Sequence, residues 1–175
     1  IFYLKNKTFN RGPRLGRIYA SLEVCLRGRE FINKKFVPDK NTSSVFRSGT
    51  SIYKGYYEDL NEVLVNKNSN LLNENKHILY GIKRLIESKN GLLFRLNYLN
   101  KHNYVTLDES LVKNIKQLLN TLEISFQLMS KYAFTMNIKY LERANQRFKE
   151  AEELDICVLT EAINLFQKPL IERLF

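Results

Sequence analysis

Apolar and polar residues alternate in the segment from Ile18 to Leu26. The apolar positions are every second residue, namely Ile18, Ala20, Leu22, Val24 and Leu26. This two-residue period is typical of a strand with one buried face, and residues 27–29 follow it as a turn. A helix that buries Ile18, Leu22, Cys25 and Leu26 is the alternative interpretation. The alternation favours the strand.

Further short apolar runs follow this predicted strand. Residues 31–37 end before Pro38, and residues 45–46 and 52–53 lie on either side of a turn at residues 48–51. We therefore expect a small sheet or a partly extended arm before residue 55.

The apolar spacing then changes to three or four residues, which is the period of a helix. A short helix over residues 56–66 precedes a polar linker over residues 66–70. The helices predicted after the linker run from Glu74 to a stop at Asn90-Gly91, from a capping box at residues 106–109 to Met129, from Ile138 to Ala151, and from Ile156 to Gln167 before Pro169. Residues 92–99 fit either a helix or a buried strand. Four apolar stripes of this kind can bury one another in a bundle.

These patterns together predict an α-dominated α+β protein. Residues 1–70 form a basic, partly extended or β N-terminal region, and residues 71–175 form a helical bundle. No run of about 18 apolar residues occurs, so we expect no transmembrane span. The first five residues turn charged too early for a signal peptide, and two distant cysteines suit a reducing environment. We therefore expect an intracellular protein, with the mitochondrial matrix as one candidate location.

Positive charge is concentrated in the first third of the chain. Of the formal net charge of +10, residues 1–54 carry twelve bases against three acids, whereas residues 55–175 carry sixteen bases against fifteen acids. So many positive charges repel one another in a compact state, and this favours binding to an anionic partner. Aromatic residues are interleaved with these bases, and aromatic rings can stack on unpaired nucleobases. This combination indicates RNA as the partner.

The predicted RNA contacts all lie in this basic region. Residues 11–17 place three guanidinium groups on a stretch that the sequence predicts to be stiff and poorly helical. The residues predicted to contact the RNA backbone are Arg11, Arg14, Arg17, Arg27, Arg29, Lys34 and Lys35, and those predicted to stack on bases are Tyr3 and Phe9. The function that we expect is a non-catalytic structural component of a ribonucleoprotein, such as an organellar ribosomal protein, with RNA and neighbouring proteins as partners.

No residue pattern indicates catalysis, a metal or a cofactor, so we expect none of the three. Cys25 and Cys157 have no second cysteine or histidine at ligand spacing, and no phosphate-binding glycine loop occurs. His77 and His102 lie in settings typical of surface or capping residues. The acids at 150, 152, 153 and 155 indicate a solvated, salt-bridged helix face.

Two other functions remain open from the sequence. The main alternative is an accessory structural subunit of a large protein or membrane-associated complex, with the basic region lying on acidic neighbours or lipid. The more distant one is a small helical nuclease. The spacing of Arg95 and His102 resembles that of helical ribonucleases of the HEPN class, although the polar residue that usually follows the Arg is Leu96 here.

Overall fold

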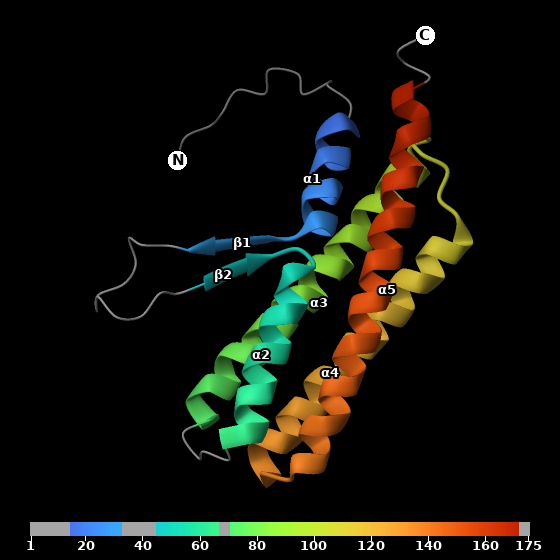
Figure 1. Cartoon of the computed structure of the whole chain (residues 1–175). Coiled ribbons are helices and arrows are strands. Elements are labelled where there is room, and N and C mark those ends of the chain that lie inside the picture. The colour runs from blue at the N-terminus through green and yellow to red at the C-terminus, as the bar shows by residue number, and fades with distance from the viewer. Residues whose placement is uncertain (1–14, 33–44, 67–70, 172–175) are drawn as a thin grey trace, which may run out of the picture.

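Five helices and two short strands make up the part of the chain that the structure, a computed structural model, describes: residues 15–32, 45–66 and 71–171 (Figure 1). In chain order the elements are α1 (Leu15–Arg27), β1 (Arg29–Ile32), β2 (Val45–Ser48), α2 (Ser51–Asn66), α3 (Leu71–Lys101), α4 (Glu109–Thr135) and α5 (Ile138–Ile171). No helix among these residues is long and apolar enough to cross a membrane.

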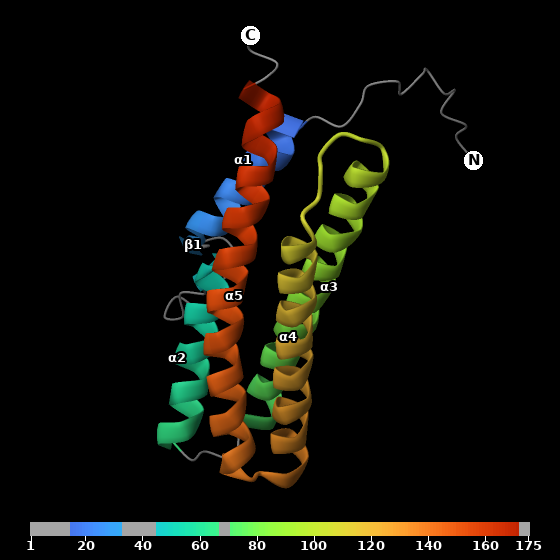
Figure 2. The same cartoon turned by 90° about the vertical axis from the view of Figure 1, so that its right-hand side faces the viewer.

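Helix α5 is the centre of the packing. It contacts α4 along most of its length, and α1 and α2 lie against its other sides, while α3 packs on α4 (Figures 1 and 2). The apolar stripes of these helices meet in one hydrophobic cluster, in which Leu118, Leu122, Leu141, Phe148 and Phe166 are completely buried. Residues three and four apart supply each stripe, as the sequence period requires. The predicted helical bundle is therefore present.

The predicted α+β class is wrong, because the described chain is an all-helical bundle. Its only strands are β1 and β2, four residues each, which pair antiparallel with Arg29 opposite Ser48 and Ile32 opposite Val45. This ribbon extends sideways from the junction of α1 and α2 (Figure 1). Two short strands of this kind supply no layer against which helices could pack.

The predicted strand over residues 18–26 is helical instead. These residues belong to α1, in which Leu22 is buried and Ile18, Cys25 and Leu26 pack against the core. Val24, which the strand interpretation places on the apolar side, is 38% exposed. The contact with α5 decides between the two patterns, because it buries residues at helical spacing. Residues 52–53 are likewise helical, since α2 begins at Ser51.

The turn between β2 and α2 closes the end of α1. Thr50 donates its backbone N–H to the carbonyl of Cys25 at 3.0 Å and its hydroxyl to the carbonyl of Leu26 at 2.9 Å. These bonds satisfy carbonyls that a helix end leaves without partners. Gly49 allows the turn to approach the end of α1 this closely. Its φ is +62°, and a Cβ at this position would lie 2.2 Å from the Cys25 oxygen. The turn before α2 is thereby hydrogen-bonded to the C-terminal end of α1.

Several predicted helix ends differ from the observed ones. Helix α3 continues through Asn90-Gly91 to Lys101, so residues 92–99 are helical. Helix α4 is capped by Asp108, whose side chain accepts from Ser110 N, and not by residue 106. The two helices predicted after Ile138 are one helix, α5, which also contains Pro169.

One hydrophobic cluster includes residues from both sides of the boundary predicted at residue 70. Leu15 and Leu22 of α1, and Tyr53 and Leu60 of α2, belong to the same hydrophobic cluster as the later helices. The boundary itself stays a prediction, since residues 67–70 lie outside the described part of the chain.

Candidate nucleic-acid interface

Three large aromatic side chains of α3 point into solvent. Tyr80, Phe94 and Tyr98 are 58%, 74% and 50% exposed. Their separations of 14 and 4 residues correspond to nearly whole turns, which places all three on one face of the helix. The opposite face carries Ile82, Leu85, Leu96 and Leu99, which are buried in the core. Each exposed ring leaves at least one of its two faces free to stack on another flat group.

Positive charges accompany these rings. The Arg84 guanidinium carbon lies 5.2 Å from the centre of the Tyr80 ring, and Arg84 Nε donates to the Tyr80 oxygen at 2.7 Å. Lys83 and Lys101 are exposed close to the same helix face. Glu87 is the one acid on it and pairs with Arg84 at 3.2 Å. The face is therefore aromatic and net positive.

The aromatic series continues at the end of α3. The ring of His102 lies 4.4 Å from that of Tyr98, centre to centre, and 6.5 Å from that of Tyr104. We call the set of Tyr80, Lys83, Arg84, Phe94, Tyr98, Lys101 and His102 the α3 aromatic face.

A polar groove borders the α3 aromatic face. It lies between α3 and α4, has a volume of about 550 Å³ and is lined in part by Asn97, Lys113 and Lys116. Asn97 is three residues after Phe94 and four before Lys101, so it is their neighbour on the helix surface. Two lysines against one acid, Glu109, extend the positive potential from the rings into the groove. Amide and ammonium donors of this kind suit phosphate and sugar oxygens.

Of the residues predicted to contact RNA, the structure describes the side chains of two. Arg17 and Arg27 are exposed on α1, and neither forms an ion pair with a described residue. Arg29 lies in β1, where the structure describes the backbone alone. The remaining predicted contacts, Arg11, Arg14, Lys34, Lys35, Tyr3 and Phe9, lie outside the described residues. The expected non-helical stretch over residues 11–17 is wrong from Leu15 onward, because α1 begins there.

Sequence reasoning missed the α3 aromatic face. Its signal was a set of aromatic residues displaced from the apolar stripe: Tyr80 lies between Ile78 and Ile82, and Tyr98 between Leu96 and Leu99. The sequence of residues 92–99 fits both a helix and a strand, and only the helix places Phe94 and Tyr98 on the face opposite the buried leucines.

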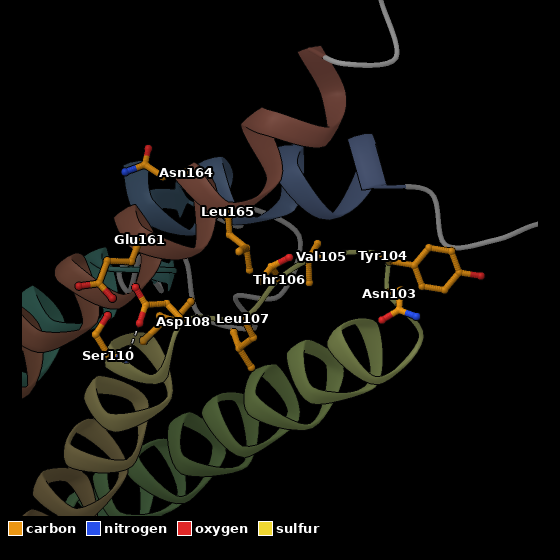
Figure 3. A pocket seen from close by; sticks show the side chains of 11 residues that line it. Asn103, Tyr104, Val105, Thr106, Leu107, Asp108, Ser110, Glu161, Asn164 and Leu165 are labelled. Carbon is orange, nitrogen blue, oxygen red and sulfur yellow. Dashed lines mark hydrogen bonds between the residues drawn. The ribbon is translucent and has the colours of Figure 1, made fainter.

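A pocket beside the α3–α4 connection holds polar groups that already serve the fold. It measures about 740 Å³ and lies between the α3–α4 connection and α5 (Figure 3). Asp108 caps α4, and Glu161 Oε1 accepts from Asn114 at 2.9 Å and from the Cys157 thiol at 3.4 Å. That hydrogen bond raises the pKa of Cys157, so the thiol is less nucleophilic than a free cysteine. The pocket therefore offers no activated nucleophile among these groups.

Arg95 and His102 do not form a joint polar site. Arg95 lines a cavity shared with α1 and α5, whereas the His102 ring packs with two tyrosines, and no hydrogen bond joins the two side chains. Leu96, which follows the Arg, is 1% exposed and belongs to the core.

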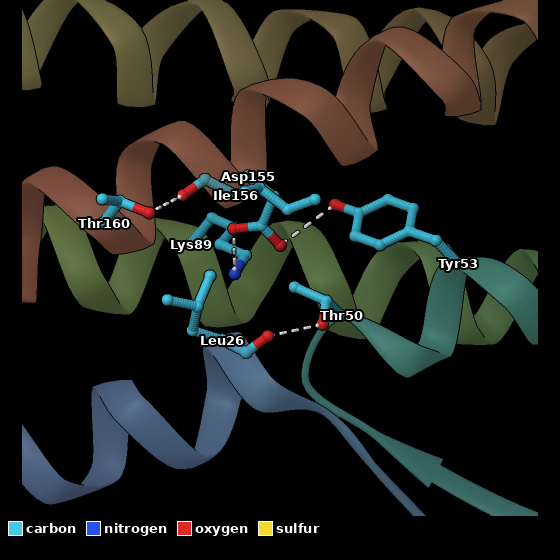
Figure 4. A network of polar contacts seen from close by, with 7 residues as sticks. All are labelled: Leu26, Thr50, Tyr53, Lys89, Asp155, Ile156 and Thr160. Carbon is cyan, nitrogen blue, oxygen red and sulfur yellow. Dashed lines mark hydrogen bonds and ion pairs between the residues drawn. The ribbon is translucent and has the colours of Figure 1, made fainter.

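A buried ion pair fixes the middle of the bundle (Figure 4). Lys89 Nζ of α3 lies 2.6 Å from Asp155 Oδ1 of α5, and the Tyr53 hydroxyl of α2 donates to Asp155 Oδ2 at 3.2 Å. Lys89 and Asp155 are 7% and 1% exposed. Burial, followed by the nearby Asp155 charge, raises the pKa of Tyr53 well above its ordinary value. The interpretation of the acidic run as a solvated face is therefore wrong for Asp155, although Glu150 does pair with Arg147 at the surface at 2.5 Å.

The described residues contain no group of three or more His, Cys, Asp or Glu side chains that could hold a metal ion. Comparison of the chain with protein-family models, with curated proteins and with solved structures gives no match.

Proposed function

We propose that this protein is a non-catalytic, RNA-binding structural component of a ribonucleoprotein. The observation that carries the proposal is the α3 aromatic face, on which three exposed rings stand beside cations. Stacking on aromatic rings contributes about 1–3 kcal/mol per base and tolerates any sequence. Lysine and arginine add affinity by releasing the counterions of the phosphates. Unpaired stretches of RNA match both features, since their bases are free to stack.

The uneven charge of the chain supports the same proposal. The nine excess positive charges of residues 1–54 lie at one end of the sequence, and two of the residues concerned, Arg17 and Arg27, are exposed on α1. In this proposal they contact phosphates in addition to the α3 aromatic face. An assembly such as an organellar ribosome is the setting that we propose, because its structural proteins bind RNA without cleaving it.

A second surface favours contact with neighbouring proteins. Phe134, Met136 and Ile138, at the turn between α4 and α5, are 89%, 45% and 39% exposed. Clustered apolar residues at the surface are typical of protein interfaces. This turn lies at the opposite end of the bundle from the C-terminal end of α3 (Figure 2). RNA contacts that reach the C-terminal end of α3 and protein contacts at this turn would suit a component that joins the two.

The test is the affinity of the full chain for a short single-stranded RNA, measured by fluorescence anisotropy. The double variant Phe94→Ala/Tyr98→Ala removes two exposed rings and should weaken binding at least about tenfold. Phe134→Ala is the matched control, because it removes a still more exposed ring at the other end of the bundle, and it should change the affinity less than about twofold. Equal losses in the two variants would contradict the assignment of the α3 aromatic face. Absence of RNA binding by the unchanged chain would contradict the function itself.

A further inference from the structure

A cavity of about 320 Å³ lies between α1, α3 and α5. Its walls are aliphatic or aromatic: Leu22 of α1, Leu96 and Leu99 of α3, and Leu159 and Phe166 of α5 are all at most 6% exposed. Small-molecule sites in proteins are mostly apolar, with a few polar groups, and begin at about this volume. The space is therefore suited to a small apolar group rather than to a large ligand.

The mouth of this cavity is basic. Arg17 of α1 and Arg95 of α3 line it and are exposed, together with the hydroxyl-bearing residues Ser21 and Ser88. Neither arginine forms an ion pair with a described residue. Lys89 also lines the cavity, but Asp155 neutralises its charge. None of the described residues that line the cavity is acidic. Two uncompensated guanidinium groups thus stand at the opening of an apolar space.

We propose that this cavity binds an aliphatic carboxylate of medium chain length. The hydrocarbon chain lies among the leucines and Phe166, and the carboxylate stays at the mouth between Arg17 and Arg95. Guanidinium groups bind carboxylates through paired, charge-assisted hydrogen bonds. The serine hydroxyls can donate to the same oxygens. The described residues of the walls include no asparagine or glutamine whose amide could pair with the edge of a nucleobase, and this favours an acyl chain over a nucleotide.

This inference does not depend on RNA binding. Arg95 and the residues of the α3 aromatic face lie on the same helix, yet the cavity opens between α1 and α3, and the exposed rings do not line it. Arg17 is the one residue shared with the proposed RNA contacts, so Leu92→Trp, which fills the cavity without changing a charge, is the variant that separates loss of carboxylate binding from loss of RNA binding.

The first experiment is isothermal titration calorimetry of the full chain with a series from hexanoate to dodecanoate at neutral pH. Each added CH₂ that enters the cavity should tighten binding about fourfold. The gain should stop once the chain outgrows the space. The neutral alcohols of the same lengths are the ligand control, and they should bind at least about tenfold more weakly than the acids. Absence of saturable binding, or equal binding of acids and alcohols, would overturn the proposal.

Variants then separate the two parts of the site. Arg17→Gln/Arg95→Gln should weaken decanoate at least about tenfold and leave decanol within about twofold. Arg143→Gln, an exposed arginine of α5 that does not line the cavity, is the matched control and should change neither ligand. Leu92→Trp should remove binding of both ligands by filling the space. If that variant does not fold, Ser21→Phe at the exposed mouth serves the same purpose. Decanoate binding that survives in a folded, filled variant would refute the site.

Discussion

Replacing Lys89 by methionine tests the buried centre of the bundle. Methionine keeps most of the length and apolar contacts of the lysine stem but removes the ammonium group, which lies 2.6 Å from Asp155. The carboxylate, 1% exposed, would then keep the Tyr53 hydroxyl as its one remaining partner. Breaking a buried ion pair from one side costs about 3–5 kcal/mol, because it leaves a charge without compensation. We expect that loss here, out of a total stability of about 5–15 kcal/mol.

Urea unfolding followed by circular dichroism measures this loss. For a chain of this length a loss of 3–5 kcal/mol also lowers the Tm by about 6–20 °C. Tyr53→Phe, which removes one hydrogen bond to the carboxylate, should cost less, about 1–3 kcal/mol.

The strictest check compares the effect of Asp155→Asn on the free energy of unfolding in two backgrounds, where it should have opposite signs. Asp155→Asn in the unchanged chain leaves Lys89 buried without a counter-charge and should destabilise it. In the Lys89→Met background the same substitution removes the unpaired charge, keeps an acceptor for Tyr53 and should restore stability. If Asp155→Asn destabilises both backgrounds equally, or if Lys89→Met costs less than about 0.5 kcal/mol, the reasoning is refuted.

Three further predictions concern other parts of the molecule. The pKa values of Tyr53, Tyr56 and Tyr57 are raised, chiefly by burial, so their contribution to stability is complete below pH of about 10 and is lost as the pH rises towards the folded-state pKa values. The two well-buried rings, Tyr53 and Tyr56, should lower the free energy of unfolding there by up to about 3 kcal/mol per pH unit, and Tyr53→Phe should reduce this slope by about a half. Gly91→Ala, at a position of α3 with nothing within 4 Å of the added Cβ, should stabilise the protein by about 1 kcal/mol, whereas Gly49→Ala should destabilise it by at least about 2 kcal/mol in the same denaturation assay. Because Glu161 raises the pKa of Cys157, Glu161→Gln should speed alkylation of that thiol by iodoacetamide a few-fold, as mass spectrometry would show, and an unchanged rate would argue against the bond.

The helical bundle could be predicted from the sequence because its stripes are long. In α4, Leu111, Ile115, Leu118 and Leu122 repeat at helical spacing and are all buried, as the pattern predicts. The segment of α1 is only 13 residues long, and its apolar residues satisfy both a two-residue and a helical period. The contact with α5 chooses between them, and that contact is between residues far apart in the sequence.

Local sequence signals for a helix end or an exposed residue were likewise outweighed by contacts that form only in the folded protein. Asn90-Gly91 resembles a helix end, but a glycine inside a helix costs only about 1 kcal/mol, and the buried residues on both sides, Leu85 and Leu96, outweigh it. Asp155 looked like one of several solvated acids. Its burial depends on Lys89 and Tyr53, which lie 66 and 102 residues away in the chain, so no local pattern could reveal it.

The sequence predicted which kinds of residue form the candidate site, but not where in the chain they lie. Bases interleaved with aromatic rings were expected before residue 55, whereas the described part of the chain presents that combination on α3, which lies within residues 55–175, a segment with sixteen bases against fifteen acids. Composition averages over a segment and therefore hides a single helix face. The exposure of Phe94 and Tyr98 can be inferred only when it is known that Leu96 and Leu99 face the core.

Binding of the full chain to single-stranded RNA across a salt series is the most direct test of the proposed function. We predict that the logarithm of the affinity falls linearly with the logarithm of the salt concentration, by about 0.7 for each phosphate contacted. The double variant Lys83→Gln/Lys101→Gln should reduce that slope by about 1.4, since two cations of the α3 aromatic face are removed. Binding that is absent at low salt, or a slope that the double variant leaves unchanged, would contradict the account.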